Sequence, residues 1–260
     1  MKTLRTIDDV RAQLTREVGL VPTMGALHDG HRALFAAARR ENELVVASLF
    51  VNPAQFDQDA DLAAYPRDLE ADARIAEEGG VDILFAPSAD ELYPDGFRSW
   101  VDVEDTGPEG IARPGHFRGV ATVCLKLFNI VRPARAYFGQ KDAQQALVIR
   151  RMVHDLNLEL DIRVLPTVRD PDGLALSSRN VRLTPEQRAQ ALALPRALAQ
   201  GRDAYTKGSD AVAATRNSLN GLTPEYVEIL ELDDATLLAS AVRVGSIRLI
   251  DNVILKGSLT

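Results

Sequence analysis

The sequence has few of the residues that build disulfides, metal sites or membrane spans. Its 260 residues include one cysteine, Cys124, and four histidines. A single cysteine cannot form an internal disulfide, which favours a reducing compartment. A zinc site needs three or four ligands and would use most of the cysteine and histidine residues that the chain has. No apolar run approaches the ~18 residues of a membrane span, and the first ten residues have no apolar signal core. We therefore expect a cytoplasmic protein without a membrane partner.

Positive charge is also scarce. Lysine and arginine total 30 against 37 aspartates and glutamates, so the formal net charge is −7. Chains that bind nucleic acid usually carry a basic surface, so we expect small-molecule partners and no nucleic acid. The composition, 46% hydrophobic and 26% charged, is that of an ordinary globular protein with room for one large or two modest domains.

Short apolar strands alternate with helical segments over most of the chain. Residues 44–51 form an unbroken apolar run typical of a central parallel strand, and residues 119–131 are apolar nearly all round, as in a buried helix. The other expected strands are 18–21, 81–85, 136–138 and 158–164, and the other expected helices are 31–41, 67–79 and 141–156. This order predicts an α/β fold with a Rossmann-like doubly wound parallel sheet, which binds ligands beyond the carboxyl ends of its strands.

The pattern changes near residue 176. Residues 184–187, Thr-Pro-Glu-Gln, form a helix start, and the helix that follows is rich in alanine and leucine to about residue 206. Strands are expected at 226–232 and 246–255. We predict a Rossmann-like ligand-binding domain over residues 1–176 and a smaller α+β C-terminal domain over residues 177–260 that closes over the site.

The most informative segment is residues 22–31, Pro-Thr-Met-Gly-Ala-Leu-His-Asp-Gly-His. It follows an apolar strand and places His28 and His31 one turn apart at a helix start. Free backbone N–H groups favour an anion there, and Gly25 lets the backbone approach a ligand. Two such histidines can also be a metal pair or unrelated surface residues. His-x-Gly-His after a strand resembles the signature of nucleotidyltransferases and class I aminoacyl-tRNA synthetases, which act at the α-phosphate of ATP.

Polar residues follow other strands. Gln55, after an Asn52-Pro53 turn, offers a neutral amide, although the segment also fits a plain surface loop. Tyr65, Arg67 and Asp72 add an aromatic ring, a cation and a carboxylate, or else only cap a helix and cover a solvated face.

Three further segments suit an anion. Residues 113–119 carry two arginines and His116 before the buried helix. Lys141 opens a helix, where a cation costs roughly 0.3–1 kcal/mol unless a polyphosphate is bound, and Gln145 lies one turn beyond. Residues 177–179, Ser-Ser-Arg, place hydroxyls and a guanidinium on a loop that can close over a triphosphate.

Taken in order, these segments resemble the pantoate–β-alanine ligases (pantothenate synthetases) of the HxGH nucleotidyltransferase superfamily. The matching blocks are residues 22–31, 50–56, 116–119, 139–145 and 172–180, with residues 248–252 resembling the family's C-terminal domain. The resemblance implies an AMP-forming ligase that condenses pantoate with β-alanine through a pantoyl-adenylate and releases pyrophosphate. It also implies ATP and Mg²⁺ as cofactors and a homodimer.

The resemblance implies roles for individual residues. The catalytic set is His31, as proton donor, with His28, Lys141 and Arg179 as further positive donors. The ATP-binding set is Met24, Gly25, Ala26, Leu27, His28, Asp29, Gly30, His31, Gly139, Gln140, Lys141, Asp142, Val168, Leu176, Ser177, Ser178 and Arg179. The substrate-binding set is Gln55, Gln145, His116 and Tyr65, and Asp72 is the expected ligand of ATP-bound Mg²⁺. Gln140 stands where many relatives have glutamate.

Two alternatives stay open at this point. A nucleotide adenylyltransferase shares His-x-Gly-His but needs a base pocket in place of Gln55 and Gln145. A non-catalytic ATP-binding regulator would have little reason to combine His31 and Lys141 with these two glutamines. Pantoate-dependent pyrophosphate exchange separates the first alternative from a ligase, and turnover to AMP separates the second.

Overall fold

The N-terminal part of the chain forms the predicted parallel sheet. The computed structural model describes residues 1–14, 17–57, 59–104, 106–232 and 235–259. Its six-stranded sheet has the order β1-β4-β3-β2-β5-β6, and the pairings recorded among the described residues are all parallel. The strands are β1 (Lys2–Leu4), β2 (Val18–Thr23), β3 (Leu44–Leu49), β4 (Ile83–Phe85), β5 (Arg135–Gly139) and β6 (Asp161–Leu165). The α/β doubly wound fold is thereby confirmed.

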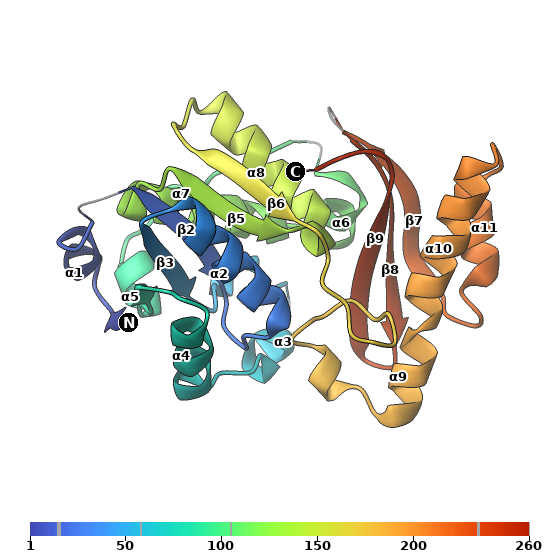
Figure 1. Ribbon diagram of the computed structural model, residues 1–260, viewed down its shortest axis with the longest axis horizontal. Helices are drawn as coiled ribbons and strands as arrows, with labels where there is room; N and C mark the ends of the chain where they lie inside the picture. Colours follow the sequence, from blue (N-terminus) through green and yellow to red (C-terminus); the bar gives the residue numbers. More distant parts are fainter. Residues whose placement is uncertain (15–16, 58, 105, 233–234, 260) are drawn as a thin grey trace.

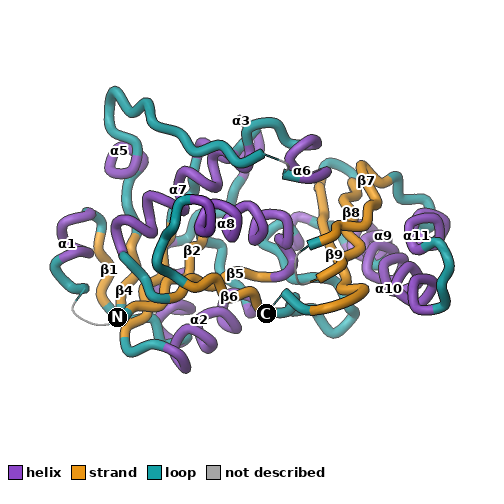
Figure 2. Tube along the Cα trace, turned by 90° about the horizontal axis from the view of Figure 1, so that it is seen from above, coloured by secondary structure: helices purple, strands orange, loops and turns teal. Residues whose placement is uncertain are grey.

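Helices cover both faces of this sheet. In Figure 2, α7 (His116–Val131) and α8 (Ala143–Asp155) lie on one face and α2 (Asp29–Glu41) on the other, where α4 (Leu69–Glu78) joins the same apolar cluster. The remaining elements are α1 (Ile7–Arg11), η1 (Pro53–Gln55), α3 (Asp59–Ala64), α5 (Ala89–Leu92), α6 (Gly107–Ala112) and η2 (Gln140–Asp142). Because both faces are covered, the central strands β2 and β3 are mostly apolar.

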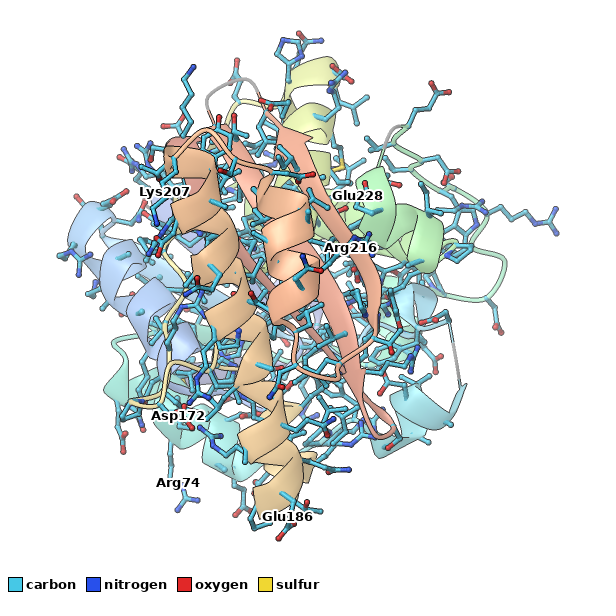
Figure 3. All side chains as sticks on the ribbon, turned by 90° about the vertical axis from the view of Figure 1, so that its right-hand side faces the viewer. Arg74, Asp172, Glu186, Lys207, Arg216 and Glu228 are labelled. Atoms are coloured by element: carbon cyan, nitrogen blue, oxygen red, sulfur yellow. The ribbon has the colours of Figure 1, made fainter. Side chains whose placement is uncertain are left out.

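The C-terminal part forms a second lobe beside the first (Figure 1). Its antiparallel sheet has the order β7-β8-β9. The elements are η3 (Asn180–Arg182), α9 (Pro185–Ala191), α10 (Ala193–Thr206), α11 (Ala211–Ser218), β7 (Pro224–Glu231), β8 (Ala235–Val244) and β9 (Ile247–Gly257). Figure 3 looks onto its outer side, where α10 and α11 lie in front of the strands, with Glu186 at one end and Lys207 at the other.

The second lobe has an apolar core of its own. Leu174 packs there with buried side chains of α10 and the sheet. The division of the chain at residues 176/177 stays a prediction. Within the described ranges, no helix is both long enough and apolar enough to cross a bilayer.

Several elements differ from the sequence-based predictions. β8 and α11 were not predicted, nor were the short β1 and α1. Residues 235–242 of β8 read Ala-Thr-Leu-Leu-Ala-Ser-Ala-Val, and all eight are buried. This part of the strand therefore shows no polar alternation, and its alanines and leucines favour a helix. The predicted strand at 44–51 ends at Leu49, and the one at 158–164 begins at Asp161. The predicted helix at 141–156 opens as the 3₁₀ turn η2 before α8.

Candidate active site

A cleft lies where the chain order of the sheet reverses. From the adjacent strands β2 and β5, the chain proceeds outward in opposite directions, and such a switch point leaves a crevice at the carboxyl ends of the strands. Two cavities open there. The inner cavity, about 220 Å³, contains His28 and His31 in its wall, and the outer cavity, about 310 Å³, extends to β9. Their shared wall consists of Met24, Gln55, Lys141, Asp142, Gln145, Ser177 and Arg179.

The loop after β2 is fixed by Asp72 of α4. The Ala26 and Leu27 N–H groups donate to its two carboxylate oxygens at 2.9 and 2.7 Å. Gly25 has φ +86°, and a Cβ there would lie 2.8 Å from Asp72 Oδ2. Asp72 is only 3% exposed and both its oxygens are used, so it supports the loop and is not placed to be the magnesium ligand that we expected.

The two histidines form the start of α2. His28 is the N-cap, and its Nδ1 accepts a hydrogen bond from the Gly30 N–H at 3.1 Å. His31 Nδ1 accepts from the His28 N–H at 3.2 Å, which completes a capping box. Because both Nδ1 atoms accept, the proton of each neutral ring is on Nε2. Both residues line the inner cavity, and Nε2–H is the ring donor that each has left for a ligand there.

The charge of these histidines differs from the prediction. Burial, reinforced by nearby Lys141, lowers the pKa of His28 to about 4. Burial and the neighbouring His28 ring lower the pKa of His31 to about 3. Both rings are thus neutral at pH 7 in the ligand-free protein, so the expectation of positive donors is wrong for them.

The free backbone N–H groups that we expected are also largely used, because those of Ala26, Leu27, His28 and Gly30 already donate to side chains.

The cations of the shared wall are Lys141 and Arg179. Lys141 Nζ lies 3.2 Å from Asp142 Oδ1. Burial opposes ionisation of Asp142, but Lys141, together with Arg179 and His116, outweighs burial and lowers the pKa of this carboxyl. Arg179 lies 2.9 Å from Asp61 of α3, which also binds Arg182 at 3.3 Å. Each cation of the shared wall is therefore paired with a carboxylate before any ligand binds.

Gln55 is held as a neutral donor between the cavities. Asn52 Nδ2 donates to Gln55 Oε1 at 3.1 Å and to the Gly119 carbonyl at 3.1 Å. A Cβ on Gly119 would lie 2.3 Å from the Ala54 carbonyl oxygen, so only glycine lets α7 approach η1 this closely. The Gln55 amide nitrogen faces Met24 Sδ at 2.9 Å. The role of Asn52 in holding Gln55 was not predicted, because Asn52-Pro53 was interpreted only as a turn.

His116 and Tyr65 were expected to bind substrate, and their polar atoms contact protein groups. The His116 Nδ1–H donates to the Gln55 carbonyl at 2.8 Å, and Nε2 accepts from Arg113 at 3.2 Å. Burial and Arg113 lower the pKa of His116 to about 4. Tyr65 lies in the wall of the inner cavity, where its hydroxyl donates to the Gly25 carbonyl and accepts from Ser178, both at 3.4 Å. Both residues thus support neighbouring parts of the site.

Most of the predicted ATP-binding residues come together in the inner cavity. Those that line it are Met24, His28, Gly30, His31, Gly139, Lys141, Asp142, Val168, Leu176, Ser177, Ser178 and Arg179. Those that line neither cavity are Gly25, Ala26, Leu27, Asp29 and Gln140. The sequence did not indicate the outer-cavity residues Asp61 and Arg182, nor the ion pair in which Arg248 holds Glu109 at 2.7 and 2.8 Å.

We expect stability to fall in mild acid because of the buried histidines. An unfolded histidine takes up a proton near pH 6.5, whereas His31 does so only near pH 3 in the folded protein. Below pH 6.5 the unfolded chain therefore binds more protons, and the free energy of unfolding decreases by about 1.4 kcal/mol per pH unit for each such histidine. Urea unfolding of the wild type and of His31→Gln at pH 6.0, 5.5 and 5.0 measures this. The free energy of unfolding should fall less steeply with decreasing pH in His31→Gln than in the wild type. Equal slopes for the two proteins would contradict the pKa assigned to His31.

Comparison with known proteins agrees with this geometry. The family model described as pantoate–β-alanine ligase matches residues 1–254. The pantothenate synthetase of Moorella thermoacetica is 51% identical, with 98% of this chain and 99% of that protein covered. The crystal structure of pantothenate synthetase from Thermus thermophilus is 48% identical over 98% of this chain and 100% of that chain, with a TM-score of 0.93.

A second solved structure is described with ligands. The pantoate–β-alanine ligase of Francisella tularensis, complexed with β,γ-ATP and β-alanine, is 36% identical over 98% of both chains, with a TM-score of 0.85. The resemblance inferred from the sequence is confirmed. This chain belongs to the pantoate–β-alanine ligase (pantothenate synthetase) family.

Proposed function

We propose that this protein joins pantoate to β-alanine at the expense of ATP, through a pantoyl-adenylate. The observation that carries the proposal is the wall shared by the two cavities. It presents two cations, Lys141 and Arg179, beside two neutral amides, Gln55 and Gln145. The cations suit a polyphosphate, and the amides suit a hydroxy acid whose carboxylate must stay nucleophilic. We assign ATP to the inner cavity and pantoate to the shared wall.

In the first step, a pantoate carboxylate oxygen attacks the α-phosphorus, and the bond from that phosphorus to the bridging oxygen breaks. Pyrophosphate leaves with the bonding electrons. The negative charge that develops is stabilised by the His28 and His31 Nε2–H groups together with Lys141 and Arg179. Because both imidazoles are neutral before ATP binds, they act first as hydrogen-bond donors. His31 is the assigned proton donor to the leaving group, and it can act as one only after its ring has taken up a second proton, which the nearby negative charge of the triphosphate favours.

In the second step, the β-alanine amine attacks the acyl carbon of the adenylate. AMP leaves, the amide bond forms, and the nitrogen loses a proton. The outer cavity adjoins the shared wall and offers an approach for this second substrate. Keeping the adenylate away from water is the remaining task of the cleft, and the two lobes surround it.

The proposal includes Mg²⁺ and a homodimer, both on the basis of the family. Across the described ranges, no group of three or more His, Cys, Asp or Glu side chains is arranged to hold a metal ion. The donor set therefore fits Mg²⁺ carried by the triphosphate, where it would offset phosphate charge, and does not fit an all-protein cage. A cytoplasmic location remains an expectation from cysteine usage.

AMP release tests the function. The purified protein is incubated with ATP and Mg²⁺, with pantoate and β-alanine added separately and together. We expect pyrophosphate release to require pantoate and sustained AMP release to require both substrates. Pyrophosphate formation with a mononucleotide but not with pantoate would support an adenylyltransferase instead.

We expect Gln145→Ala and Gln55→Ala to raise the KM for pantoate about tenfold or more and to change the KM for ATP much less. Each removes a neutral hydrogen-bonding group from the shared wall. Gln145→Ala is the cleaner variant, because Gln55 also takes part in the Asn52 network. Steady-state kinetics with each substrate varied, and with the exposed Gln190→Ala of α9 as control, measure the effect. A change confined to the KM for ATP would contradict the assignment of pantoate to the shared wall.

A further inference from the structure

One strand of the C-terminal lobe contacts the turn that carries Lys141. Asn252 lies in β9, is 2% exposed, and directs its side chain at η2. Its Nδ2 donates to the Gln140 carbonyl at 2.9 Å and to the Lys141 carbonyl at 3.0 Å. Its Oδ1 accepts from the Gln140 side chain at 3.1 Å. All three hydrogen bonds join the two lobes.

The two carbonyl contacts restrict the backbone at Lys141. The Gln140 carbonyl belongs to the peptide group before the Lys141 Cα, and the Lys141 carbonyl belongs to the peptide group after it. Holding both peptide groups fixes the φ and ψ angles between them, and these angles set the direction of the Lys141 side chain. The turn has no side-chain cap of its own, since Gly139 is its N-cap residue. Asn252 contacts the turn in a different way from a cap, because its amide donates to two carbonyl groups of the turn.

Asn252 is itself held by its neighbour Asp251, which is paired with Arg169. Its backbone N–H donates to Asp251 Oδ1 at 2.8 Å. The buried Asp251 carboxylate accepts two hydrogen bonds from Arg169, at 2.6 and 2.9 Å. Arg169 also donates to the Gly173 carbonyl at 3.2 Å and begins the segment that reaches Arg179. The pair Asp251-Asn252 therefore contacts both ligand-facing segments, the Lys141 turn and residues 169–179.

We infer that Asn252 is a positioning residue for the adenylation step, which acts by holding the Lys141 turn in register with residues 169–179 across the two lobes. The inference rests on the proposed function for its chemistry. Asn252 acts through Lys141, although its side chain also forms part of the outer cavity wall. Loss of its amide donors leaves Lys141 present but free to move, and a displacement of about 1 Å at a reacting centre costs up to 10²-fold in rate.

The test uses Asn252→Ala and Asn252→Asp. The aspartate keeps the shape and the acceptor oxygen but replaces the NH₂ donor with an oxygen that repels the two carbonyls. We expect both variants to slow single-turnover pyrophosphate release about 10- to 100-fold, with the KM for pantoate changed much less. Thr215→Val is the matched control, because it removes a buried hydrogen bond from α11 in the same lobe, away from the cleft. It should lower the unfolding temperature without slowing the step.

A double-mutant cycle separates positioning from a general structural role. If Asn252 acts through Lys141, then Asn252→Ala should have almost no further effect on the rate in a Lys141→Met background. Additive losses, or an Asn252→Asp variant with wild-type rate, would overturn the inference. A wild type that releases no pyrophosphate with pantoate would instead overturn the proposed function, so the two failures are distinguishable.

Discussion

Replacing Lys141 with alanine is expected to slow pantoyl-adenylate formation by about 10²–10³-fold, the usual cost of one lost transition-state donor. Lys141 lies in the shared wall and faces both cavities, so its ammonium is available to the phosphates in the inner cavity. Rapid-quench measurement of pyrophosphate release in the presence of ATP and pantoate gives the rate.

The same substitution leaves Asp142 with less compensation for its charge, because Lys141 is the main cause of its lowered pKa. A lower unfolding temperature is therefore expected as well, and the rate must be corrected for the folded fraction by circular dichroism. Lys207→Ala, at the outer end of α10, is the control for loss of a lysine far from the cleft (Figure 3). A corrected rate within tenfold of the wild type would contradict the assigned role.

Replacing His31 is expected to slow the ATP-dependent step by ~10²–10⁴-fold and to leave the second step much less affected. His31 lines the inner cavity, where pyrophosphate leaves, whereas the leaving AMP phosphate of the second step is assigned to Lys141 and residues 177–179. The second step is measured separately with synthetic pantoyl-adenylate and β-alanine.

Two variants separate the chemical role of His31 from its capping role. Alanine removes both the ring and the bond to the His28 N–H. Glutamine is the usual partner in a capping box and can keep that bond, so His31→Gln should unfold near the wild-type temperature and still lose the first step. If both half-reactions fall equally in His31→Gln, the proton-donor assignment is wrong.

The general fold and the position of the cleft were predictable because they depend on local pattern. His28 follows β2 and Lys141 follows β5, two strands that the sequence marks clearly, and the carboxyl ends of parallel strands meet at one edge of a sheet. β8 was not predictable in this way, because a strand buried on both faces shows no alternation.

The electrostatic state of the site was predicted less well, because it depends on contacts between distant segments. The neutral state of His31 results from burial, which no local pattern reveals. Asp61 meets Arg179 across 118 positions of chain, and Asn252 reaches Gln140 across 112. Such pairs are fixed by the packing of the two lobes.

The way the first turn of α2 is closed has a consequence for mutational tolerance. A phosphate site built from backbone N–H groups survives most substitutions, since every residue except proline supplies the same donor. Here the N–H groups of Ala26, Leu27, His28 and Gly30 are already used inside the loop, so recognition falls to side chains. Each side-chain donor is supplied by one particular residue, so a single substitution removes the hydrogen bond that it makes. Substitutions at His28 or His31 are therefore expected to weaken ligand binding more than substitutions in a site built from backbone N–H groups would.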